Sequence, residues 1–217
     1  MLDNARLTLL KTRKRGEGEA SFVFYDHTFG TEAVKVLPGE YFVWHEDIVI
    51  QTVLGSCVAA CLCDRGAGIG GMNHFMLPDG NDDSARYGGY AMELLINELM
   101  KRGARRSALE AKVFGGGAVI SGMASINIGK QNVEFVQRFL STEHIPIVSK
   151  DVLGVYPRRV AFFPASGKAM VKRLASTNTA MVKKLTTGMA EPVAQDEAAY
   201  RGRVSQRGAA AGSVELF

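Results

Sequence analysis

Short runs of β-branched and apolar residues, separated by Gly and Pro turns, are the feature that most constrains the fold of this chain. Four such runs lie in the first half, at residues 34–37, 47–54, 57–63 and 68–77. Their length and composition are typical of β-strands, and glycine, proline or aspartate residues end them. Because the last three of these runs have short connections, they predict an antiparallel meander.

The spacing of apolar residues then changes to that of a helix. Between Ser84 and Arg102, apolar residues recur at intervals of three and four, and Gly103 follows. This pattern predicts an amphipathic helix that ends at a glycine. A second amphipathic helix is predicted over residues 130–143, with Asn127 as its N-terminal cap.

The remaining runs complete a mixed fold. Further strands are predicted at residues 109–114, 145–149, 158–163 and 168–174. We therefore expect the α/β (α+β) class, with mostly antiparallel β-sheet layers and two main helices. The domain should span residues 33–175, between an N-terminal extension (1–32) and a basic C-terminal tail (176–217) whose weak periodicity predicts disorder.

Composition and charge narrow the class of protein further. Apolar residues make up 47% and charged residues 22%, the balance of an ordinary globular protein. No apolar run approaches the roughly 20 residues that span a bilayer, and no apolar stretch follows the basic N-terminal residues. We therefore expect a cytoplasmic protein that carries no secretory signal and does not insert into a membrane.

The net charge of +4 comes from the two ends of the chain. Residues 21–171 carry fourteen basic and fifteen acidic groups, so the central region has a net charge of −1. A nucleic-acid-binding domain would instead concentrate Lys and Arg on a folded face, so a nucleic-acid partner is not expected. The simplest interpretation of the charged ends is solvated, mobile chain.

The tripeptide Gly55-Ser56-Cys57 is the first candidate for chemistry. It follows the strand predicted at residues 47–54, and its small residues allow a sharp bend that leaves the sulfur accessible. Backbone N–H groups in such a bend can stabilise a developing oxyanion. A cysteine nucleophile reacts as thiolate, so it needs a base or a positive charge nearby. The alternative is that Cys57 is a small buried hydrophobic residue.

His74 is the candidate base among the four histidines of the chain. It lies in the predicted strand that follows the strand of Cys57. Adjacent antiparallel strands bring side chains within a few ångströms of one another, so a sulfur and an imidazole can come within hydrogen-bonding reach. The apolar neighbours of His74 also allow a second interpretation, in which it is a hydrogen-bonded core histidine.

A metal site and a phosphate loop are both poorly supported. Cys57, Cys61, Cys63 and His74 nominally offer four zinc ligands, but structural zinc sites usually have a second cysteine pair. Three clustered cysteines also make a poor disulfide framework, so Cys61 and Cys63 are predicted to be core residues. The glycines at 115–117 lack the Gly-Lys-Ser/Thr of a phosphate loop, and they predict a sharp strand exit or a place where the backbone of a ligand comes close.

Two long stretches carry a family resemblance. Residues 52–62 (TVLGSCVAACL) and 70–78 (GGMNHFMLP) resemble the signature of CheD, the family of chemoreceptor glutamine deamidases. Further matches follow in the same order, at Arg86-Tyr-Gly88, Ala91-Met-Glu93, residues 109–116, Ile128-Gly129, Gln131-Asn132, Asp151, Gly154 and residues 158–160. The resemblance covers about residues 33–174 and implies an α/β sandwich shared with certain glutamine-deamidating bacterial toxins.

The resemblance also implies the site residues. The catalytic cysteine of the family falls on Cys57 and its catalytic histidine on His74. A threonine a few residues before the cysteine is implicated as well, and it falls on Thr52, although a gapless alignment puts Gln51 there. The implied reaction needs no cofactor and no metal: the sulfur attacks a glutamine side-chain amide, ammonia leaves, and water hydrolyses the thioester.

The implied function is therefore a protein-glutamine glutaminase that converts glutamine side chains of methyl-accepting chemotaxis receptors to glutamate. CheD-like proteins also bind CheC-type phosphatases, so a non-catalytic chemotaxis adaptor is the alternative. A cysteine peptidase is a third interpretation, but the histidine of such enzymes usually lies far from the cysteine along the chain.

Overall fold

The computed structural model describes residues 4–78, 87–119 and 128–174, and within them it shows two five-stranded sheets and three α-helices. The first sheet has the strand order β1 (Phe22–Asp26), β2 (Thr31–Lys35), β4 (Val49–Leu54), β9 (Arg158–Phe162) and β10 (Ala169–Arg173). The second has the order β3 (Tyr41–Trp44), β6 (Ile69–Asn73), β5 (Val58–Asp64), β7 (Glu110–Gly115) and β8 (Ile147–Val152). The helices are α1 (Asn4–Thr12), α2 (Gly88–Lys101) and α3 (Ile128–Thr142).

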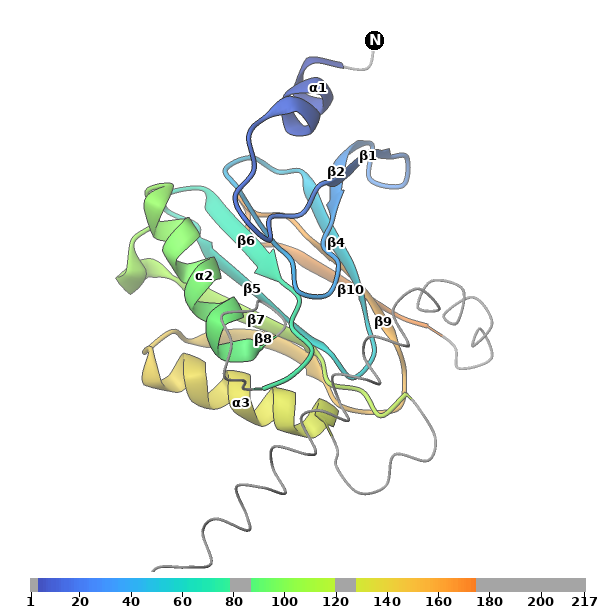
Figure 1. The fold of residues 1–217 in the computed structure, drawn as a ribbon, viewed down its shortest axis with the longest axis vertical. Helices are drawn as coiled ribbons and strands as arrows, with labels where there is room; N and C mark the ends of the chain where they lie inside the picture. Colours follow the sequence, from blue (N-terminus) through green and yellow to red (C-terminus); the bar gives the residue numbers. More distant parts are fainter. Residues whose placement is uncertain (1–3, 79–86, 120–127, 175–217) are drawn as a thin grey trace, which may run out of the picture.

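The fold class predicted from the sequence is confirmed. Strand pairs β2–β4 and β7–β8 are parallel, whereas the other pairs in both sheets are antiparallel. Helices α2 and α3 lie side by side over the outer face of the second sheet (Figure 1). Residues 102–103 end α2 as expected, with a φ of 100° at Gly103. None of the described helices is long and apolar enough to span a bilayer.

Strand β5 is buried on both faces, which explains its almost continuous apolar sequence. Ala60 and Leu62 face the core beneath α2 and α3. Ala59, Cys61 and Cys63 face the core between the two sheets. The prediction that Cys61 and Cys63 are core residues is therefore confirmed, since each is only 1% exposed.

The predicted meander is wrong at its first strand. Strand β4 belongs to the first sheet, where it pairs with β2 and β9, while β5 and β6 form an antiparallel hairpin in the second sheet. The chain crosses between the sheets at residues 55–57. The spacing of apolar residues and the turn residues cannot distinguish a hairpin from such a crossing. In both cases a short glycine-containing link joins two apolar strands.

The N-terminal segment differs from the expectation of solvated chain. Strand β1 is the edge strand of the first sheet, helix α1 packs against it, and both Leu10 and Ala20 are fully buried. The proposed cap Asn127 and the C-terminal tail (176–217) lie outside the described residues, so those two predictions stay predictions.

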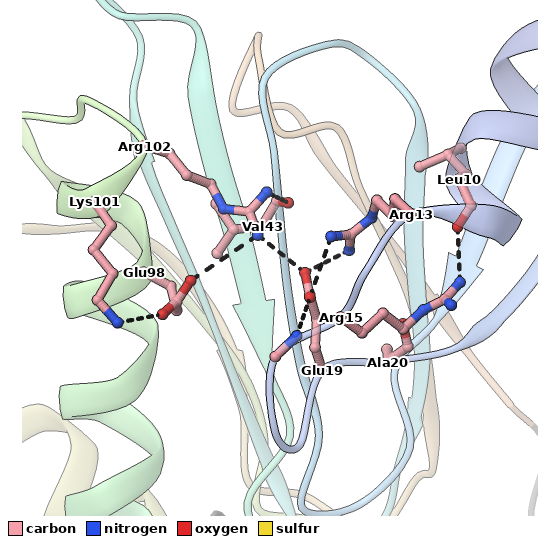
Figure 2. Close-up of polar contacts among 10 residues, drawn as sticks. Leu10, Arg13, Arg15, Glu19, Ala20, Val43, Glu98, Lys101 and Arg102 are labelled. Carbon is pink, nitrogen blue, oxygen red and sulfur yellow. Dashed lines mark hydrogen bonds and ion pairs between the residues drawn. The ribbon is translucent and has the colours of Figure 1, made fainter.

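A buried carboxylate, Glu19, ties this segment to the rest of the domain (Figure 2). Its Oε1 accepts hydrogen bonds from Arg13 at 2.5 Å and from Arg102 at 3.1 Å. Its Oε2 accepts from Arg13 at 3.2 Å and from the backbone N–H of Gly16 at 3.0 Å. Because Arg102 follows helix α2, this cluster links the N-terminal segment to a helix about 80 residues further along the chain.

Candidate active site

The crossing between the sheets, Gly55-Ser56-Cys57, is held in place by the glycines at 115–117. The backbone N–H of Gly116 donates to the carbonyl oxygen of Cys57 at 2.8 Å, and that of Gly117 donates to the carbonyl oxygen of Gly55 at 2.8 Å. Gly115 has a φ of 109°, and a Cβ at this position would collide with the carbonyl oxygen of Cys57. The backbone that comes close to these glycines is that of the protein's own cysteine bend, and the approach of a ligand backbone stays a prediction.

The register of the hairpin determines which face His74 occupies. Cys61 pairs with Met72, and the same register continues to Val58 and Phe75, which exchange two backbone hydrogen bonds of 3.0 Å. His74 is therefore opposite Ala59, whose side chain faces the core between the sheets.

Cys57 lies two residues before Ala59, so the alternation of a strand directs its side chain to the same face. In this register Cys57 and His74 are diagonal neighbours across the hairpin, a relation in which long side chains interact. Cys57 is partly exposed and packs against two groups of buried residues, one between the sheets and one formed by residues 76, 77, 87 and 128. The three cysteines therefore differ in access, because only Cys57 is partly exposed.

Thr52 on strand β4 contacts His74 from the facing sheet. Its hydroxyl oxygen lies 2.9 Å from Nδ1 of His74 and 2.8 Å from the carbonyl oxygen of Val36. Both side chains are 2% exposed. Gln51, the other candidate from the sequence, points elsewhere, because its amide donates to Asp26. The structure thus brings Thr52, and not Gln51, to the histidine.

The carbonyl of Val36 decides the tautomer of His74. A carbonyl oxygen can only accept a hydrogen bond, so the single hydroxyl proton of Thr52 is donated to Val36. Nδ1 of His74 must then carry a proton and donate it to the oxygen of Thr52. Nε2 is left with its lone pair, and it is buried with no hydrogen-bond partner among the described residues.

The protonation state of His74 follows from its burial. Desolvation lowers its pKa from 6.5 to about 4, and a hydrogen bond with the backbone of Val36 opposes this shift only in part. The imidazole is therefore neutral at pH 7, with Nε2 able to accept a proton.

Cys61 and Cys63 differ from a reactive cysteine because their pKa values are raised. Burial raises the pKa of Cys61 well above its usual value, and burial together with the charge of Glu110 raises that of Cys63 to about 11. Both therefore remain thiols at neutral pH, and a thiol is a poor nucleophile and a poor metal ligand. In the part of the chain that the structure describes, no group of three or more His, Cys, Asp or Glu side chains is arranged to hold a metal ion.

Asn132 is the residue of this region that the sequence analysis did not single out as part of the site. It lies on α3, is fully buried, and donates from Nδ2 to the carbonyl oxygens of Ser56 at 3.1 Å and Met76 at 2.8 Å. A signal was present, because the buried positions of α3 are otherwise glycine or aliphatic residues. An amide on the apolar face of a helix needs buried partners, so it indicates a polar contact within the domain.

The comparisons with known proteins agree on one class. A family model described as CheD chemotactic sensory transduction matches residues 76–173. A protein of Albidiferax ferrireducens named probable chemoreceptor glutamine deamidase CheD 1 is 52% identical over 98% of this chain and 87% of its own length. The probable chemoreceptor glutamine deamidase CheD of Janthinobacterium sp. is 51% identical, over 91% of this chain and 95% of its own length. This chain therefore belongs to the CheD family.

Proposed function

We propose that this protein is a protein-glutamine deamidase, which converts glutamine side chains of methyl-accepting chemotaxis receptors to glutamate. In this proposal Cys57 is the nucleophile, His74 is the base and Thr52 orients the histidine. The observation that carries the proposal is the contact between Thr52 and His74, since it leaves Nε2 with a lone pair on the face that the register shares with Cys57. The names of the relatives support the same reaction.

The proposed reaction begins when Nε2 of His74 takes the thiol proton of Cys57. The sulfur then attacks the side-chain amide carbon of the glutamine, and the carbonyl oxygen becomes an oxyanion. The C–N bond breaks as Nε2 returns the proton to the nitrogen, so that ammonia leaves and a thioester remains. Water attacks the thioester with His74 as base, which releases glutamate and restores the thiol. No metal or organic cofactor enters these steps.

The depressed pKa of His74 favours one form of the first step. An imidazole that is neutral at pH 7 is available to take a proton during attack, whereas a preformed thiolate–imidazolium pair would need a charged histidine in a buried position. We therefore propose that proton transfer accompanies formation of the sulfur–carbon bond. For the oxyanion we propose the backbone N–H groups of Ser56 and Cys57, because N–H groups in the bend that carries the nucleophile can stabilise the developing charge.

The test is incubation of the purified chain with the cytoplasmic domain of a chemoreceptor, followed by site-resolved mass spectrometry and an assay of released ammonia. Wild-type protein should convert specific glutamines to glutamate, and Cys57→Ala should do neither while keeping its fold. Full activity in that variant would remove the assignment of the nucleophile. Cleavage of the receptor chain would instead indicate a peptidase.

The proposal also implies a location and a set of partners. A protein that modifies the cytoplasmic helical region of receptors must work in the cytoplasm. The adaptor alternative predicts a different outcome of the same test, namely unchanged glutamines together with binding to a CheC-type phosphatase.

A further inference from the structure

The two strands that carry the proposed site separate at a defined point. Val58 and Phe75 form the last doubly hydrogen-bonded pair of the hairpin before Cys57. Regular antiparallel pairing would next join residues 56 and 77 by backbone hydrogen bonds. The carbonyl oxygen of Ser56 instead accepts from the side chain of Asn132, and that of Leu77 accepts from the backbone of Gly88.

The amide of Asn132 therefore takes the place of a ladder hydrogen bond. Its two N–H groups reach the carbonyl oxygens of Ser56 and Met76, one on each of the separating segments. Ser56 directly precedes Cys57, and Met76 lies two residues after His74. One rigid planar group on a third element thus bridges both segments that carry the proposed catalytic side chains.

Helix α3 is itself held close to the cysteine bend. Gly129, in its first turn, packs on Gly116, and a Cβ on Gly129 would lie 2.5 Å from the carbonyl oxygen of Gly116. Gly116 in turn donates its backbone N–H to Cys57. The position of Asn132 relative to Cys57 is therefore set by backbone contacts on both sides, which is the kind of support a precise site requires.

Within residues 4–78, 87–119 and 128–174, the hydrogen bonding of Asn132 is incomplete. Its carbonyl oxygen Oδ1 is buried and has no hydrogen-bond partner among the described residues.

We propose that Asn132 is a positioning residue of the deamidation site, which holds Cys57 at the correct place relative to His74 by bridging the two separating segments. The inference rests on the proposed function, since it assigns a role at the same site. Asn132 acts through the backbone of Ser56 and Met76, and it need not touch the substrate.

Asn73 offers a matched control. It is also a buried asparagine that bridges separate elements: Oδ1 accepts from the backbone N–H of Ala60 at 3.0 Å, and Nδ2 donates to the carbonyl oxygen of Ala91 at 3.0 Å. It lies on the face of the second sheet that α2 covers, away from Cys57. Both Asn→Ala changes remove a buried amide, but only one of them frees the cysteine bend.

The test compares Asn132→Ala with Asn73→Ala in the full chain, at a temperature where circular dichroism shows both variants folded. One assay measures the rate at which iodoacetamide labels Cys57, across a range of pH. The other measures kcat and KM for ammonia release from a chemoreceptor cytoplasmic domain. We expect Asn132→Ala to lower kcat by about 10- to 100-fold and to change the labelling rate of Cys57, because small displacements of reacting groups have effects of this size.

Asn73→Ala should leave the labelling rate of Cys57 unchanged, because its bridge joins Ala60 to Ala91 and leaves the contacts to the carbonyl oxygens of Ser56 and Met76 in place. Equal effects of the two substitutions, or normal kcat and labelling in Asn132→Ala, would overturn the inference. If Asn132→Ala does not fold, Asn132→Ser, which keeps one donor, should show the same changes in reduced form. The labelling assay uses no receptor, so it tests the positioning role even if wild-type protein releases no ammonia and the proposed function fails.

Discussion

Two buried polar groups of this protein differ in how completely they are paired. In the Glu19 cluster both carboxylate oxygens accept hydrogen bonds from Arg13, and a second partner completes each of them (Figure 2). In the candidate active site, the hydroxyl of Thr52 has hydrogen-bond partners in Val36 and His74. Nε2 of His74 and Oδ1 of Asn132, however, are buried with no hydrogen-bond partner among the described residues.

The difference separates stability from function. An unpaired buried polar atom costs on the order of 1–3 kcal/mol, and within the described residues the Glu19 carboxylate avoids this cost although Nε of its partner Arg13 does not. A group that must accept a proton from a substrate or from a nucleophile cannot have its lone pair already occupied. The lone pair of Nε2 of His74 is therefore what a proton acceptor requires, and the complete pairing of the Glu19 carboxylate is what an anchor requires.

The largest expected effect is on catalysis by His74→Asn. Asparagine keeps a side-chain donor near Thr52 but has no lone pair at the position of Nε2, so ammonia release should fall by about 10²- to 10⁴-fold. The midpoint of urea unfolding should change little. If most of the variant protein is unfolded but its folded fraction is as active as wild type, His74 is a core histidine. The comparison between a reactive site and an anchor would then be wrong.

The next effect is on stability and concerns Glu19→Ala. Removal of this carboxylate leaves Arg13 and Arg102 without their shared partner, so the free energy of unfolding should fall by about 2–4 kcal/mol. Urea denaturation measures this loss, and kcat at low temperature should stay at the wild-type value. The exposed neighbour Glu17 provides the control, since Glu17→Ala should lie within about 0.5 kcal/mol of wild type.

The third effect is a dependence of stability on pH. The pKa of His74 is lowered to about 4 in the folded state, against 6.5 for an unperturbed histidine, so between these values the unfolded chain binds the additional proton. The stability contributed by the neutral imidazole is present above pH 6.5 and is lost as the pH falls toward 4, by at most about 3 kcal/mol.

Denaturation curves of wild type and His74→Asn at a series of pH values isolate this contribution. The difference in unfolding free energy between the two proteins should change over that pH range and level off above it. A difference that stays constant between pH 4 and 6.5 would contradict the burial of a neutral imidazole.

The smallest expected effect comes from Thr52→Val. Valine has nearly the same shape as threonine but cannot accept a hydrogen bond from Nδ1, so the tautomer of His74 is no longer determined. We expect kcat to fall by about 10- to 100-fold, the range seen when the partner of a functional histidine is removed. Thr52→Ser should restore most of the activity, and a serine variant as slow as valine would show that the hydroxyl is not the relevant group.

Much of the architecture was predictable from local patterns. Eight of the ten described strands and the helices α2 and α3 were predicted within a few residues, because the spacing of apolar residues and the turn residues are local signals. The sheet to which β4 belongs was not predictable, because a hairpin and a crossing between sheets share the same local signals. Strands β1 and β3 and helix α1 were not predicted, and the two strands are only five and four residues long.

The sequence by itself determined most of the elements, the apolar core and the choice of Cys57 and His74 as candidates, because these follow from residue type and from spacing along the chain. Thr52 became a candidate through the resemblance to the CheD family. Only the tertiary structure decided that Thr52 and not Gln51 meets His74, that the carbonyl of Val36 sets the tautomer, and that Asn132 bridges the separating strands. These facts depend on which sheet each strand joins. That choice is made by long-range pairing and packing, which no local pattern encodes.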